Sequence, residues 1–267
     1  MKLLAKVPFV LALLGLVAAA VSAQTVSQIE NEIAGHFDKL DKASNYGGTS
    51  DYDVLEKENQ ALRAALLKYG NRADVLAYSF PKLKDRITTV TSADGRLRTY
   101  SWDTDTGGTM HDFLTVYQFR GSDGKVGSWA DPYSMDMEKR GAGAFVTQIF
   151  QTPSAAGTIY LTTSTFIGST SLAGQTISAL RIGRDRLDLK PKVIKTAKGL
   201  TDSISFEYDF FSVVDHPERP IKLVFYDPKN RSFRFPVVIE DSKTPQGRVT
   251  NKFITYKFDG KYFVKVS

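Results

Sequence analysis

The sequence predicts a mostly β protein of the α+β class, with an N-terminal helical hairpin followed by an antiparallel β-rich domain. Apolar residues recur every three or four positions over residues 25–70, and every second position from about residue 75. Short turn signals separate the alternating segments, with no helical pattern between them. The predicted parts are a signal peptide (1–23), the helical hairpin (24–74) and the β-domain (75–267).

Residues 1–23 have the composition of a secretory signal peptide. Lys2 and Lys6 precede the uncharged apolar run PFVLALLGLVAAAV, and small residues end the segment at Ala23. A retained membrane anchor is the alternative, but it needs about 20 apolar residues, more than this run supplies. We therefore expect cleavage after Ala23 and a periplasmic or secreted protein that keeps no transmembrane anchor.

Composition excludes several classes of chemistry. The chain has no cysteine, so a lipoprotein anchor, disulfides, thiolate metal sites and thiol nucleophiles are ruled out. A cysteine-free exported protein fits a bacterial periplasm or outer surface better than a eukaryotic secretory route. The net charge of +6 is dispersed and forms no Lys/Arg block, so no nucleic-acid partner is predicted.

Two helices are predicted before residue 75. Each carries a single apolar stripe, formed in the first by Val26, Ile29, Ile33, Phe37 and Leu40, and in the second by Leu55, Leu62, Leu66 and Tyr69. Ser27 and Glu30 have the spacing of a capping box, and Gly70 is a stop signal for the second helix. A lone helical hairpin is marginal, so we expect it to pack on the β-domain or on a partner.

The β-domain shows alternation of period two. In SISFEYDF, residues 203–210, the residues of one face are Ile204, Phe206, Tyr208 and Phe210. Pro236, within the strand FRFPVVIE, indicates an edge strand or a bulge. Asp-Gly pairs at 94–95, 123–124 and 259–260 predict tight hairpin turns with positive φ at both positions. The pattern leaves a sandwich, an open barrel and a propeller-like arrangement open.

The stretch SWDTDTGGTMHDF, residues 101–113, is predicted to be a hairpin turn in which Gly107 and Gly108 take positive φ. Asp103 and Asp105 fit the first and third positions of a calcium loop, but the fifth and twelfth positions lack side-chain oxygens. No Gly-x-Ser-x-Gly motif occurs, and the neighbours His111 and Asp112 would point to opposite faces of a strand. Neither a metal nor a cofactor is therefore expected.

Residues 103–109, D-x-D-x-G-x-T, resemble the Asp-box turn of sialidases and other propeller-like β-proteins. Asp105, Gly107 and Thr109 match that motif. Asp103 stands where serine is usual, and Met110 where tryptophan is usual. The resemblance implies a structural turn away from a catalytic centre, and it implies no activity.

The candidate ligand-binding residues are Trp102, Trp129 and Tyr133. Trp129 and Tyr133 lie in VGSWADPYSMDMEKRGAGAF, residues 126–145, an aromatic and methionine-rich segment that ends in Gly-Ala-Gly. Aromatic rings suit sugar faces or the apolar anchor of a partner protein. The alternative is that these side chains cap the end of the β-core.

These patterns favour a soluble exported binding module without catalytic activity, whose partner is a cell-envelope or extracellular protein or a glycan. One alternative is a secreted hydrolase that uses carboxylates such as Asp103, Asp105 and Asp112. Another is an assembly or inhibitor protein with the helical hairpin as its interface. The oligomeric state stays open.

Overall fold

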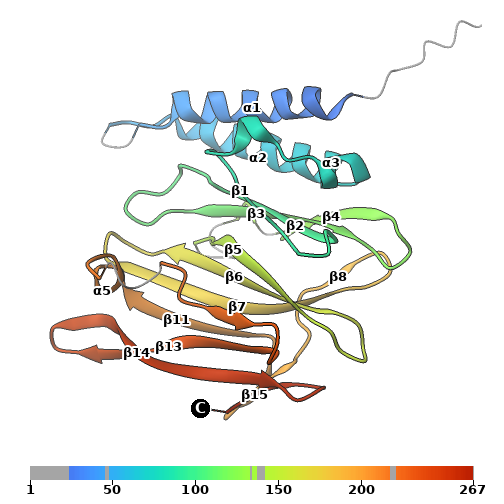
Figure 1. Cartoon of the computed structure of the whole chain (residues 1–267). Coiled ribbons are helices and arrows are strands. Elements are labelled where there is room, and N and C mark those ends of the chain that lie inside the picture. Colours follow the sequence, from blue (N-terminus) through green and yellow to red (C-terminus); the bar gives the residue numbers. More distant parts are fainter. Residues whose placement is uncertain (1–23, 46–47, 133, 137–141, 217–220, 267) are drawn as a thin grey trace, which may run out of the picture.

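The fold has four layers, a helical layer above three β-sheets (Figure 1). The computed structural model describes residues 24–45, 48–132, 134–136, 142–216 and 221–266. The predicted signal peptide lies outside the described residues. The prediction of a mostly β chain with an N-terminal helical hairpin is confirmed. Among the described helices, none has the length and apolar character needed to cross a membrane.

The helical layer comprises α1 (Val26–Ala43), α2 (Tyr52–Tyr69), α3 (Ala73–Ala77) and the short 3-10 helix η1 (Pro81–Leu83). The predicted capping box at Ser27 and Glu30 was wrong, because α1 starts two residues earlier with a box of Thr25 and Gln28. Glu30 is buried instead, where it accepts hydrogen bonds from the Tyr78 hydroxyl and the Lys82 amide. Gly70 ends α2, as predicted.

Sheet A is an antiparallel meander of β1 (Thr88–Thr91), β2 (Leu97–Asp103), β3 (Phe113–Arg120) and β4 (Val126–Ala130). Sheet B has the order β11 (Ser203–Asp209), β7 (Leu172–Ile182), β6 (Ile159–Ile167), β5 (Phe145–Thr152), and β8 (Leu187–Asp188) pairs with β7. Sheet C has the order β10 (Gly199–Thr201), β9 (Ile194–Thr196), β15 (Phe263–Lys265), β14 (Thr244–Phe258), β13 (Ser232–Asp241), β12 (Phe225–Asp227).

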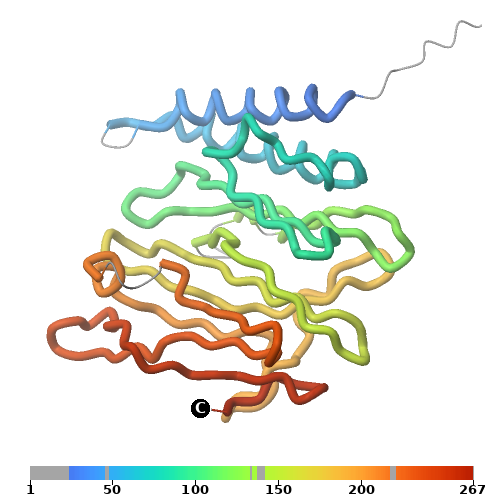
Figure 2. Tube along the Cα trace, viewed as in Figure 1, coloured from blue at the N-terminus to red at the C-terminus, as the bar shows by residue number. Residues whose placement is uncertain are grey.

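The chain builds these layers nearly in order from the N-terminus to the C-terminus (Figure 2). One excursion breaks the order, because β9 and β10 join sheet C before the chain returns to sheet B as β11. The short helix α5 (Phe211–Val214) follows β11. All strand pairs within the described residues are antiparallel except β15 with β9.

Separate apolar cores join the layers. The helical stripes pack on sheet A in one cluster that includes Ile33, Leu62, Trp102 and Val116, so the hairpin buries its apolar faces within its own chain. Leu97 and Phe119 of sheet A pack with Tyr160 and Leu180 of sheet B. A third cluster, rich in phenylalanine, joins sheet B to sheet C.

Asn59 connects the helical layer to sheet A by hydrogen bonds. It is 1% exposed, its amide nitrogen donates to the Thr104 carbonyl at 2.8 Å, and its amide oxygen accepts from the Trp102 indole N–H at 2.8 Å. Buried polar groups are costly when they lose a partner. Asn59 therefore fixes the position of α2 over the end of β2.

The predicted Asp-Gly turns are present, with one difference. Only the glycines take positive φ, at 67° for Gly95, 82° for Gly124 and 110° for Gly260. The aspartates instead accept hydrogen bonds from amides further along the turn, as Asp94 does from Arg96. An aspartate that bonds to the backbone in this way stabilises a turn without a left-handed conformation of its own.

Pro236 lies in β13 beyond the residues that pair with β12, so it pairs with β14 alone, and the register with β14 shifts between Pro236 and Val238. The bulged position predicted as one of two options is thus confirmed. The bulge also reverses the faces that follow it, because Val238 packs in a buried cluster while Ile239 is exposed.

Asp94 ties the β1–β2 turn to sheet B. Its carboxylate accepts from the Tyr160 hydroxyl at 2.7 Å and from the Ser92 hydroxyl at 2.6 Å. Burial opposes its ionisation, but the hydrogen bonds from Ser92 and Tyr160 outweigh this and hold the pKa of Asp94 below its ordinary value.

Replacement of Asn59 by alanine is expected to lower the free energy of unfolding by roughly 2–4 kcal/mol, because it leaves the Trp102 N–H and the Thr104 carbonyl without partners. Urea unfolding measures this change. The matched control is Gln60→Ala, an exposed amide on the same helix, which should change stability by less than about 0.5 kcal/mol. Equal effects of the two variants would contradict the assigned role.

Replacement of Asp94 by asparagine is expected to flatten the acid dependence of stability. The folded pKa is lowered, so the carboxylate stabilises the fold above its unfolded pKa of about 3.9, and this is lost as the pH falls through the folded value. Thermal unfolding between neutral pH and pH about 3 tests this. Tyr160→Phe, which removes one donor to the carboxylate, should reduce the part of the stability that Asp94 contributes above its pKa. If the unfolding temperature of both variants falls with decreasing pH as steeply as that of the unaltered protein, the prediction is contradicted.

Candidate functional site

The stretch 101–113 forms the predicted hairpin connection, since Asp103 of β2 pairs with Phe113 of β3. The prediction of positive φ at Gly107 and Gly108 was wrong, because Asp105 takes the left-handed conformation instead, with φ of 57°. Its amide donates to the Asp103 carboxylate at 3.0 Å. Gly107 is required for space, because a Cβ there would lie 2.0 Å from the Met110 carbonyl oxygen.

Asp112 anchors this loop from inside. Its side chain is 2% exposed, and its carboxylate accepts from the Thr104 hydroxyl at 3.1 Å and from the Gly143 amide at 3.0 Å. The latter bond crosses to the segment that leads into β5. Asp112 therefore positions two loops, and its carboxylate is engaged within the protein.

His111 pairs with Asp103, an arrangement that the sequence pattern does not predict. The His111 Nδ1 lies 2.5 Å from an Asp103 carboxylate oxygen. The residues are eight apart, and only the register of β2 with β3 brings them together. The His111 amide also donates to the Ile167 carbonyl at 3.1 Å, which fastens the loop to the end of β6. Within the described ranges, no three His, Asp or Glu side chains form a metal-binding group.

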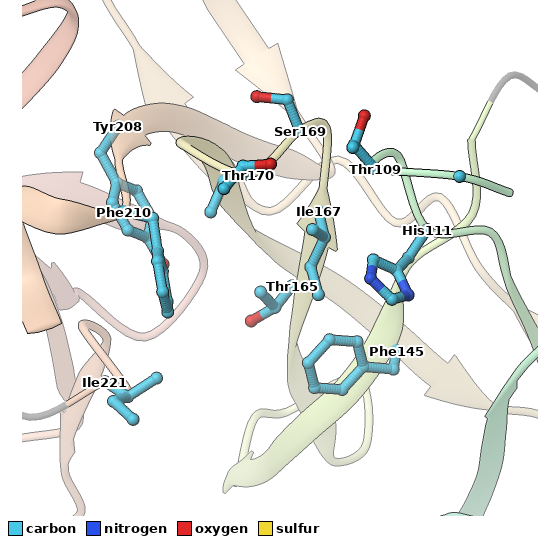
Figure 3. A pocket seen from close by; sticks show the side chains of 12 residues that line it. Thr109, His111, Phe145, Thr165, Ile167, Ser169, Thr170, Tyr208, Phe210 and Ile221 are labelled. Atoms are coloured by element: carbon cyan, nitrogen blue, oxygen red, sulfur yellow. The ribbon is translucent and has the colours of Figure 1, made fainter. Parts of the chain in front are cut away.

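A groove of about 770 Å³ lies beside this pair (Figure 3). We call it the apolar groove. Its floor is the end of sheet B, and Figure 3 shows His111 and Phe145 on one side and Tyr208, Phe210 and Ile221 on the other. The lining residues are Gly108, Thr109, His111, Phe145, Thr165, Ile167, Ser169, Thr170, Ala173, Tyr208, Phe210 and Ile221.

Exposed apolar side chains accompany the apolar groove. Ile221 is a lining residue that is 62% exposed, and Met110 and Phe211, which adjoin lining residues in the chain, are 43% and 45% exposed. Large apolar side chains gathered around an apolar hollow are typical of a binding site. Single exposed apolar residues elsewhere need no such explanation.

The predicted ligand-binding residues do not come together in one cleft. Trp102 is 2% exposed and packs in the core beneath the helices. Trp129 packs with the core between sheets A and B. The register explains the separation, because Trp102 pairs with Leu114 and Trp129 with Tyr117, and positions 114 and 117 point to opposite faces of β3. Tyr133 lies outside the described residues.

Trp129 lines a second cavity, of about 420 Å³, between sheets A and B. We call it the inter-sheet cavity. The apolar groove itself was not predicted, because its residues come from separate strands and loops that meet only in the folded chain. The one local signal is Phe210-Phe211, where alternation fails and an apolar side chain must face solvent.

No protein-family model matches the chain, and neither a curated protein nor a solved structure matches it significantly. The functional inference therefore rests on the geometry and chemistry of the two cavities.

Proposed function

We propose that the protein is an exported binding protein without catalytic activity, and that its apolar groove takes the hydrocarbon part of a cell-envelope or extracellular ligand. The observation that carries the proposal is the large groove lined by aromatic and aliphatic side chains, with exposed apolar residues beside it. Ligand pockets have volumes of about 300–1,000 Å³ and are mainly apolar, and the apolar groove fits that range.

Energetics favour an acyl chain as the occupant. Each buried methylene contributes about 0.8 kcal/mol, and association costs at least about 4 kcal/mol. A chain with about six or more buried methylenes offsets that cost without any polar contact. The hydroxyl-bearing residues Thr109, Ser169 and Thr170 lie together at one border of the groove in Figure 3, which suits the polar end of an amphiphile.

An apolar side chain of a partner protein is a weaker fit, because one side chain fills little of this volume. The helical hairpin is a weak interface candidate as well. Its stripe residues Ile29, Leu40 and Leu55 are at most 2% exposed, so they are already covered by the chain.

One observation favours a second candidate function, that of a hydrolase. The contact between Asp103 and His111 beside the apolar groove orients an imidazole as a general base requires. Ser169, the lining serine, has another role, because its hydroxyl oxygen accepts from the Ser171 and Leu172 amides. Turnover of p-nitrophenyl esters that is lost in His111→Ala would favour the hydrolase over the binding protein.

Ile167→Asp is expected to weaken binding of a medium-chain fatty acid, measured by displacement of 8-anilinonaphthalene-1-sulfonate, by at least about tenfold. The substitution places a charge in the apolar groove, and an unpaired buried charge costs more than the 1.4 kcal/mol that corresponds to tenfold. Leu200→Asp is the control, because Leu200 is 41% exposed on β10 in sheet C, and it should bind as the unaltered protein does.

Thermal unfolding of both variants shows whether the fold is kept. Absence of fatty-acid binding in the unaltered protein, or an equal loss in both variants, would contradict the proposal. Binding of an apolar peptide in place of the fatty acid would identify the groove as a protein-docking site.

A further inference from the structure

The inter-sheet cavity differs in chemistry from the apolar groove. Tyr117 and Trp129 of sheet A contribute aromatic rings, and Thr162 and Ser178 of sheet B contribute hydroxyl-bearing side chains. Lys190, which follows β8, is among the lining residues too. The cavity thus combines an aromatic wall with a polar one.

The aromatic wall is held in place by strand pairing. Tyr117 of β3 lies directly opposite Trp129 of β4, and their ring centroids are 5.7 Å apart at a tilt of 58°. Cross-strand aromatic pairs of this kind stabilise each other, so the two rings present a fixed surface. Both side chains are only half-buried, although they lie between two sheets.

The polar tips of both rings lack partners. Neither the Trp129 indole N–H nor the Tyr117 hydroxyl makes a hydrogen bond to any residue that the structure describes. A tyrosine hydroxyl with its ordinary pKa of about 10 is protonated at neutral pH, and burial raises the pKa of Tyr117 further, to about 12, so the hydroxyl is a donor. Neither atom is among the buried polar atoms that lack a partner, so both tips are accessible, and the inter-sheet cavity that both residues line leaves room for a ligand to supply the acceptors.

Three more deeply buried aromatic side chains of sheets A and B do have partners. The Trp102 indole N–H donates to Asn59 at 2.8 Å, the Tyr100 hydroxyl donates to Gln118 at 2.6 Å, and the Tyr160 hydroxyl donates to Asp94 at 2.7 Å. At these three positions the chain itself supplies the acceptor for the polar tip. At Tyr117 and Trp129 it supplies a cavity.

We propose that the inter-sheet cavity is a second binding site, which takes a neutral carbohydrate ring. A sugar has apolar faces that stack on aromatic side chains, and its ring hydroxyls accept from an indole N–H or a phenol and donate to hydroxyl oxygens. The aromatic wall meets the first need, and the unpaired donors with the Thr162 and Ser178 side chains meet the second. This site is independent of the acyl chain proposed for the apolar groove.

The test is a titration of the full chain with a panel of neutral mono- and disaccharides, in which tryptophan fluorescence reports binding. The chain has two tryptophans, and one of them lines the cavity. Saturable binding is expected. Tyr117→Phe and Trp129→Phe keep an aromatic ring but remove one donor each, and each should weaken binding about fivefold to tenfold. Calorimetry reports binding in the tryptophan variant.

Stability separates a binding role from a structural one. A tyrosine hydroxyl that bonds within the protein stabilises the fold, so its removal lowers the unfolding temperature. The Tyr117 hydroxyl has no such bond, so Tyr117→Phe should leave the unfolding temperature unchanged or raise it. Tyr262→Phe, in the turn between β14 and β15, is the control and should change neither saccharide binding nor the fold.

The proposal is overturned if no saccharide in the panel binds, if both phenylalanine variants bind as the unaltered protein does, or if Tyr117→Phe lowers the unfolding temperature. Preferential binding of a nucleoside over every sugar overturns the ligand class. Fatty-acid binding reports on the apolar groove alone, so the two proposals fail separately.

Discussion

The structure depends on one constraint, that sheet A is covered on both faces. In its strand β2, six consecutive residues are buried, because alternate side chains point into two different cores. Tyr100 and Trp102 point toward the helices, while Leu97 packs against sheet B. A strand buried on both sides must satisfy its polar groups internally, and Asn59 does so at the helical face. A helical layer, a meander and a second sheet thereby become one body.

Aspartate side chains stabilise many of the turns that connect the strands. At many turns an aspartate accepts from an amide two residues later, as at Asp94, Asp123 and Asp259. The aspartate then needs no left-handed backbone of its own, and only the glycine that follows takes positive φ. In the β2–β3 loop the same device has a further consequence. Asp103 fixes both the Asp105 amide and the His111 ring, and Asp112 fixes Gly143. Turn chemistry thus positions one wall of the apolar groove.

The two cavities lie close to each other and offer contrasting surfaces. Phe113 lines the inter-sheet cavity, Phe145 lines the apolar groove, and their ring centroids are 4.7 Å apart. The apolar side chains of one cavity and the polar and aromatic side chains of the other meet at this phenylalanine pair, so the two proposed sites are neighbours of different chemistry. The proposed binding role thus refers to two specific cavities, and neither proposal uses a catalytic group.

The local sequence pattern by itself determined the two helices and their apolar stripes, the alternating strands, the Asp-Gly turns and the bulge option at Pro236. Each of these features depends on residues within about ten positions of one another. It also singled out Trp129, which lines a cavity. Tertiary structure alone decided the rest. Trp102 and Trp129 are both aromatic residues of one span, but strand register sends them to opposite faces of sheet A. The contact of His111 with Asp103 and the meeting of Phe145, Tyr208 and Ile221 arise from hairpin closure and sheet stacking, which bring together residues that no sequence spacing relates.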